Sequence, residues 1–238
     1  YGHSHPRILS AAGQALEMGL NLGAHHGKEI ALAEVVTRRF NLELVRFTNS
    51  ETEANMVALS AARCFTGRSK IMPMEGGYHG GTLYFSHGAS PVNAPFDCVL
   101  GRYNDIEATR TLIAQHADDL AAVILEPMLG GGGCIPAEAG FLSMLQEETQ
   151  ARGIVLIFDE VMTSRLHPGG LSARFGIEPD LKTLGKYVGG GMSFGAFGGK
   201  REIMAQFDPT GPNPLPHAGT FNNNPLTMTA GQAAMTEI

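Results

Sequence analysis

The sequence predicts an α/β fold with a mostly parallel central sheet and helices on both faces. Short apolar runs alternate along the chain with segments of helical spacing. The runs lack a polar residue at every second position, as is typical of strands that are buried on both faces. We see no internal repeat and no linker, so we expect one domain body over residues 1–238.

Each strand is predicted from a short apolar run between turn-forming or charged residues. The run at 154–158 is the clearest because every residue in it is apolar, and the run at 97–100 is the weakest. The predicted strands are 45–48, 70–75, 97–100, 121–125, 154–158, 181–184 and 194–197.

The helices are predicted from apolar residues spaced three or four apart, most regularly at 28–40. A helix also opens within 49–55 and runs to 65, with Ser50 or Thr52 as its cap. The other predicted helices are 7–18, 105–116, 139–152, 201–207 and 227–238.

Composition argues against several classes of partner. The net charge is -6 and there are no basic clusters, which disfavours nucleic acid and anionic membranes. The three cysteines are far apart and odd in number, so we expect no disulfide framework and a cytoplasmic, reducing compartment. We find no apolar run of about 20 residues and no signal peptide. The chain begins at Tyr1 and ends within a helical pattern, so we expect a piece of a longer protein.

Polar residues follow several predicted strands, where sites form in sheets of this type. Lys186 precedes the glycines 189–191, which leave open space around its amine. Each residue also has a plainer interpretation, such as a helix cap, a turn residue or an exposed lysine. The residues at strand ends are Ser50, Glu51, Thr52, Tyr78, His79, Glu126, Asp159 and Lys186.

Other chemistries find less support. The histidines lack metal-ligand spacing, so no metal site is predicted. No Gly-x-Ser-x-Gly nucleophile elbow occurs. No nucleotide-binding glycine motif occurs either, so only the high glycine content supports the alternative of a dinucleotide-dependent oxidoreductase. A lysine, a carboxylate, a stacking ring and a helix start that suits a phosphate together match the needs of a pyridoxal 5'-phosphate (PLP) enzyme.

The chain resembles the class III aminotransferases of the fold-type-I PLP enzymes. This resemblance implies that the chain is their large PLP-binding domain, without the N-terminal segment and the C-terminal small domain that family members carry. The motifs that carry it are TNSETEAN at 48–55, GYHG at 77–80, LEP at 125–127, FDEVMT at 158–163, TLGK at 183–186, GGGM at 189–192, GAFGG at 195–199 and GTF at 219–221.

The resemblance also implies roles for the site residues. Lys186 would form the Schiff base with the cofactor and then move a proton, and Asp159 would bind the ring nitrogen; these two are the implied catalytic residues. Tyr78 and Val161 would contact the two ring faces. Thr220 would reach the phosphate of a neighbouring subunit, in a homodimer with shared sites. The implied cofactor-binding set is Ser50, Glu51, Thr52, Tyr78, His79, Glu126, Asp159, Val161, Met162, Lys186 and Thr220.

Within the family, two branches share features with the chain. We favour the β-amino-acid (β-phenylalanine) aminotransferases, which pass an amino group from an amine donor to a 2-oxo acid acceptor. The glutamate-1-semialdehyde 2,1-aminomutases are the alternative, and a non-catalytic PLP-fold binding protein is the second alternative. Glu51 departs from the family because it stands where members usually have glycine, and its carboxylate would repel a phosphate unless it points away.

Overall fold

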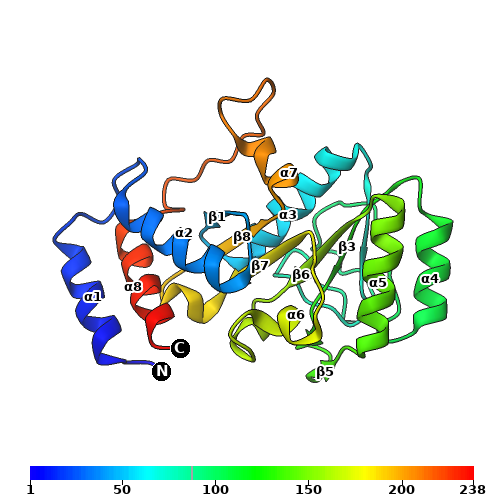
Figure 1. The fold of residues 1–238 in the computed structure, drawn as a ribbon, viewed down its shortest axis with the longest axis horizontal. Helices are drawn as coiled ribbons and strands as arrows, with labels where there is room; N and C mark the ends of the chain where they lie inside the picture. The colour runs from blue at the N-terminus through cyan, green and yellow to red at the C-terminus, as the bar shows by residue number, and fades with distance from the viewer. Residues whose placement is uncertain (87) are drawn as a thin grey trace.

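The computed structural model describes residues 1–86 and 88–238. A six-stranded sheet with the strand order β1-β8-β7-β6-β3-β2 crosses the molecule (Figure 1). Its strands are β1 (Leu44–Thr48), β2 (Lys70–Pro73), β3 (Leu120–Leu125), β6 (Val155–Asp159), β7 (Leu181–Gly185) and β8 (Gly195–Gly199). A separate two-stranded hairpin joins β4 (Met128–Leu129) to β5 (Ile135–Pro136).

The helices lie on both sides of this sheet (Figure 1). They are α1 (Pro6–Leu16), α2 (Gly27–Phe40), α3 (Glu51–Thr66), α4 (Ile106–Gln115), α5 (Ala139–Arg152), α6 (Gly170–Phe175), α7 (Arg201–Met204) and α8 (Pro225–Thr236). Short 3-10 turns occupy Thr163–Arg165, Lys186–Gly189 and Ala205–Phe207. Within the described residues, no helix is long and apolar enough to cross a membrane.

The pairing confirms the predicted, mostly parallel sheet. The pairs β2–β3, β3–β6 and β6–β7 are parallel, whereas β8 runs antiparallel to both β7 and β1. Because β8 is antiparallel to both of its neighbours, β1 runs in the same direction as β7. The carboxyl ends of β1, β2, β3, β6 and β7 therefore lie at one edge of the sheet.

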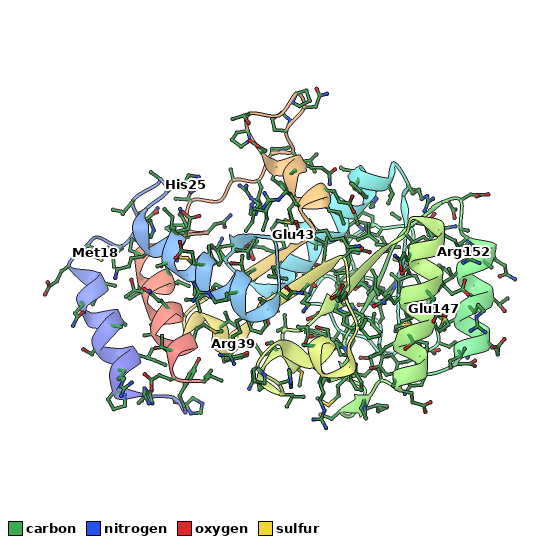
Figure 2. All side chains as sticks on the ribbon, in the orientation of Figure 1. Met18, His25, Arg39, Glu43, Glu147 and Arg152 are labelled. Atoms are coloured by element: carbon green, nitrogen blue, oxygen red, sulfur yellow. The ribbon has the colours of Figure 1, made fainter. Side chains whose placement is uncertain are left out.

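Successive residues of the central strands enter different cores, which explains their continuous apolar sequence. Ile157 belongs to a cluster with Leu59 of α3, whereas Phe158 belongs to a cluster with Phe141 of α5. A third cluster joins α2 and α8 to the β1–β8 end of the sheet. Figure 2 shows the side chains that surround the ribbon, among them the exposed Glu147 of α5.

Helix α3 is the element that most directly positions the site, and its ends follow from sequence. It begins after Ser50, whose side chain accepts a hydrogen bond from the Glu53 backbone N–H at 3.2 Å. It ends at Gly67, whose φ of 68° is the left-handed conformation that glycine adopts readily. The predicted cap at Ser50 is thus the one observed.

The predicted strand at 97–100 is wrong, and proline explains why. The segment runs beside β2, where the Val99 N–H donates to Ile71 and the Gly101 N–H donates to Pro73. Pro73 has no N–H to donate in return, so the ladder breaks into isolated bridges at Ile71–Cys98 and Met74–Gly101.

Smaller differences occur elsewhere. The strand predicted at 194–197 lies at Gly195–Gly199, and the helix predicted at 201–207 divides into α7 and a 3-10 turn. Helix α6 and the β4–β5 hairpin were not predicted, because each is too short to show a periodic pattern.

Candidate active site

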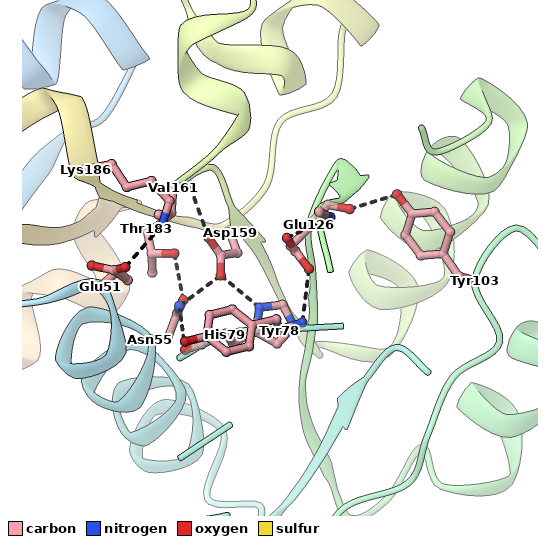
Figure 3. A network of polar contacts seen from close by, with 11 residues as sticks. Glu51, Asn55, Tyr78, His79, Tyr103, Glu126, Asp159, Val161, Thr183 and Lys186 are labelled. Atoms are coloured by element: carbon pink, nitrogen blue, oxygen red, sulfur yellow. Dashed lines mark hydrogen bonds and ion pairs between the residues drawn. The ribbon is translucent and has the colours of Figure 1, made fainter. Parts of the chain in front are cut away.

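A small cavity at the carboxyl edge of the sheet brings together most of the predicted site residues (Figure 3). Its walls come from the start of α3, the loop after β2 and the segments that follow β3, β6 and β7. The residues that line it are Glu51, Tyr78, His79, Gly80, Glu126, Asp159, Val161, Met162 and Lys186. Within the described residues, no group of three or more His, Cys, Asp or Glu could hold a metal ion.

Asp159 lies at the centre of a hydrogen-bond network (Figure 3). Its Oδ2 accepts from Asn55 Nδ2 and from His79 Nδ1, both at 2.9 Å, and its Oδ1 accepts from the Val161 backbone N–H at 3.1 Å. The side chain is only 4% exposed, so these donors offset the cost of burying a carboxylate.

Glu126 holds the glycine-rich loop after β2 in place. Its Oε2 accepts from the Tyr78 backbone N–H at 3.0 Å, and its Oε1 accepts from the Gly130 backbone N–H at 3.2 Å. Burial raises the pKa of the Glu126 carboxyl; His79 and the two backbone donors lower it, and the Asp159 carboxylate adds to the rise. Glu126 is therefore a buried residue that links two loops.

The loop that carries Tyr78 and His79 packs closely against α3. Gly80 has a φ of 116°, and a Cβ at this position would lie 2.2 Å from Thr52 Oγ1. Only glycine allows this approach without displacement. Tyr78 is 41% exposed, and its ring meets Tyr84 edge to face, with the two centroids 5.7 Å apart.

Lys186 has an unusual backbone. Its φ is 52°, a left-handed value that costs a non-glycine residue about 1–2 kcal/mol. Among the residues that the structure describes, the other non-glycine residues with positive φ are two asparagines, which tolerate it, and Cys134. Strain of this kind gathers at functional sites. The Lys186 Nζ lies 3.2 Å from Glu51 Oε1.

The first turn of α3 faces the same region. The N–H groups of Glu51 and Thr52 have no intrahelical partner, and the hydrogen bonds of the described residues include no acceptor for either. Ser50 directs its hydroxyl to the Glu53 N–H instead of the cavity. Neither Ser50 nor Thr52 lines the cavity directly, although both were predicted site residues.

Thr220 lies elsewhere. It is exposed and lines a different, larger cavity together with Arg46, Phe47 and His217. Within this chain, the structure therefore does not bring Thr220 to Lys186.

The match to known proteins covers the whole chain: the family model for class III aminotransferases matches residues 1–238. The chain belongs to the class III aminotransferase family.

Similar proteins agree with this assignment. The β-phenylalanine transaminase of Variovorax paradoxus is 52% identical over all of this chain, and its crystal structure superposes with a TM-score of 0.97. A transaminase with bound PLP is 35% identical over all of this chain, which covers 60% of that protein, with a TM-score of 0.94. A glutamate-1-semialdehyde aminomutase from Pseudomonas aeruginosa is 28% identical over all of this chain, which covers 57% of that protein, with a TM-score of 0.89. The chain spans 55% of the length of the Variovorax protein.

Two residues that support the Asp159 network were not predicted as site residues. Asn55 and Thr183 are fully buried, and Thr183 Oγ1 donates to Asn55 Oδ1 at 2.7 Å, which orients the Asn55 amide toward Asp159. Asn55 lies one helical turn after Glu51, and this spacing places both on one face of α3. That spacing is the signal that could have identified Asn55.

Proposed function

We propose that the protein is a PLP-dependent transaminase that moves the amino group of a β-amino acid, such as β-phenylalanine, to a 2-oxo acid. The observation that carries this proposal is the strained Lys186, which shares one cavity with the buried, hydrogen-bonded Asp159. The 52% identity to a β-phenylalanine transaminase supports the choice of substrate class.

The donor set fits PLP. The free N–H groups at the start of α3 suit a phosphate, because the helix terminus carries partial positive charge. Asp159 Oδ1 accepts a single hydrogen bond and keeps a lone pair for the N–H of a ring nitrogen. The side chains of Tyr78 and Val161 line the cavity and offer flat and apolar contacts for a ring.

The proposed residue roles follow from these positions. When bound, PLP supplies an aldehyde for a covalent bond to an amine and a ring that takes up the electrons of a breaking C–H bond. Lys186 Nζ would hold the cofactor and would take the proton from the amine-bearing carbon of the substrate. Asp159 would keep a proton on the ring nitrogen, and its hydrogen-bond partners Asn55 and His79 hold the Asp159 side chain in place.

The other proposed contacts surround these two residues. Tyr78, Val161, Met162 and His79 all line the cavity. The side chains of Tyr78 and Val161 would contact the faces of the ring, and Met162 and His79 would complete the wall of the site. Glu126 supports the loop that carries Tyr78. Ser50, Glu51 and Thr52 would form the phosphate end, the last two through their free backbone N–H groups.

We further propose a homodimer, in which Thr220 contributes to the phosphate end of the neighbouring subunit. The exposure of Thr220 supports this role, because its side chain is free to meet a second copy. A cytoplasmic location is supported by Cys64, Cys98 and Cys134, which are all free thiols.

An assay of amino transfer tests the proposal. The protein is incubated with PLP, β-phenylalanine and 2-oxoglutarate, and glutamate is measured. We expect glutamate formation in the wild type and a loss of at least about 1,000-fold in Lys186→Ala, because the variant lacks the group that moves the proton. Equal rates in the two proteins would contradict the proposal.

The same assay separates the aminomutase alternative, which the likeness to the Pseudomonas aeruginosa protein favours. A glutamate-1-semialdehyde aminomutase would isomerise its substrate without 2-oxoglutarate and would form no glutamate from β-phenylalanine. A non-catalytic relative would bind PLP and turn over neither substrate.

A further inference from the structure

We propose that Glu51 competes with the phosphate of the cofactor inside the site. Its carboxylate pairs with Lys186 and places negative charge at the phosphate end of the cavity. A phosphate-bearing cofactor must displace or tolerate that charge. This inference rests on the proposed function, because it assigns to Glu51 a control over cofactor loading at the same site.

The ion pair is the first observation. Glu51 Oε1 lies 3.2 Å from Lys186 Nζ, and Lys186 is the sole partner of the Glu51 carboxylate among the contacts of the described residues (Figure 3). The two side chains are 30% and 39% exposed, so neither is locked in place by burial. The pair is therefore one that a bound ligand is able to break.

Packing directs the Glu51 side chain toward the lysine. The position of a Cβ on Gly185 lies 3.1 Å from Glu51 Cβ, so the start of α3 abuts the residue just before Lys186. The backbone of Lys186 is itself held in the left-handed conformation. Both ends of the pair are thus fixed by the main chain.

Glu53 provides a comparison for Glu51, because the two acidic side chains begin in the same helical turn and make different contacts. It is the other acidic residue in the first turn of α3, yet its Oε2 accepts from the Asn49 backbone N–H at 2.8 Å. Glu53 therefore contacts the segment that precedes the helix and not Lys186. The two carboxylates at the start of α3 thus have different partners: Glu53 contacts Asn49, and Glu51 contacts Lys186.

The charged residues that line the cavity, taken together, also oppose the binding of a phosphate. Three carboxylates line it, those of Glu51, Glu126 and Asp159, and Lys186 is the one Lys or Arg among the lining residues that the structure describes. Glu126 and Asp159 accept hydrogen bonds from several N–H donors, whereas Glu51 depends on Lys186. Glu51 also carries one of the free N–H groups that suit a phosphate, so its charge opposes its own backbone donor.

The proposal predicts an effect that depends on the phosphate. Neutralising Glu51 frees the lysine for any aldehyde, but it removes repulsion only from a ligand that carries a phosphate. The gain in affinity should therefore be larger for PLP than for pyridoxal, which has the same ring and aldehyde without the phosphate.

The test compares Glu51→Gln with the matched control Glu53→Gln and with the wild type, all prepared without cofactor. Each is titrated with PLP and with pyridoxal, and the absorbance of the lysine-bound chromophore gives Kd. We expect Glu51→Gln to lower Kd for PLP at least about tenfold, equivalent to about 1.4 kcal/mol. The factor by which Glu51→Gln lowers Kd should be at least about five times larger for PLP than for pyridoxal. The control Glu53→Gln should change either Kd by less than about threefold. Glu51→Ser repeats the neutralisation with a smaller side chain.

Two results would overturn the inference while leaving the proposed function intact. One is an unchanged or higher Kd for PLP in both Glu51 variants, with the cofactor still attached to Lys186. The other is an equal gain for PLP and pyridoxal, which would confine the effect of Glu51 to the lysine. If no protein in the series attaches PLP at Lys186, the proposed function fails, and the inference fails with it.

Discussion

Glu126 is a buried carboxyl group whose hydrogen bonds connect two loops of the site. It is only 4% exposed, and its two oxygens join the loop at Tyr78 to the turn at Gly130. Burial raises its pKa, so the folded protein holds the Glu126 proton more tightly than the unfolded chain does. Stability linked to this proton is present at low pH and is lost as pH rises through the raised folded value.

Glu126→Gln keeps the shape of the side chain and removes its titration. We expect the free energy of unfolding of the wild type, minus that of the variant, to fall as pH rises from about 4 to 7. The fall should be about 1.4 kcal/mol for each unit by which the folded pKa exceeds the unfolded one. Urea denaturation of both cofactor-free proteins across this range measures it. If the difference in free energy of unfolding stays constant or increases with pH, burial is not the main influence on the pKa of Glu126.

At the scale of elements, the contact between α3 and the loop after β2 determines the shape of the cavity. The loop approaches so closely at Gly80 that an added Cβ would lie 2.2 Å from Thr52 Oγ1. The same loop carries Tyr78 and His79, so a displacement at Gly80 moves both. The neighbouring Gly81 has open space, since nothing lies within 4 Å of its Cβ position.

Gly80→Ala should therefore separate the loop from the helix, whereas Gly81→Ala should not. We expect Gly80→Ala to lower the free energy of unfolding by about 1–3 kcal/mol, because of the overlap and the positive φ. We also expect weaker binding of PLP, as the loop no longer presents Tyr78. Urea denaturation and a PLP titration check both effects. Similar losses in the two variants would mean that the close approach to Thr52 is not the cause.

At the scale of the whole molecule, the order of the strands brings distant segments to one edge. Asp159 ends β6 and Lys186 follows β7. These two strands are neighbours, and the start of α3 follows β1. β1 reaches the same edge only because β8 separates it from β7 with two antiparallel pairings. The site therefore depends on the one part of the sheet that departs from the parallel pattern.

The sequence predicted the parallel centre of the sheet, since β3 and β6 place apolar side chains on both faces. It did not predict that β8 runs antiparallel, although residues 186–194 are too few for a parallel crossover, which needs about a dozen. It did not predict the effect of Pro73, because that depends on which segment pairs with β2.

The site was predictable to a similar extent. Residues at strand ends were found because the sheet fixes their common edge. The Asn55–Thr183 contact was not found, since it joins a helix to a strand far apart in sequence. The direction of the Glu51 side chain likewise depends on the packing of α3 against Gly185.

The central claim is that Lys186 alone among the lysines forms a covalent bond with PLP. Lys182 is a built-in control, because it is buried and its Nζ donates to the Phe40 carbonyl at 2.8 Å. The most direct measurement is borohydride reduction of the PLP-loaded protein, followed by digestion and mass spectrometry. The account predicts the mass of the reduced cofactor on Lys186 and none on Lys28, Lys70, Lys182 or Lys200. Cofactor on another lysine, or on none, would contradict it.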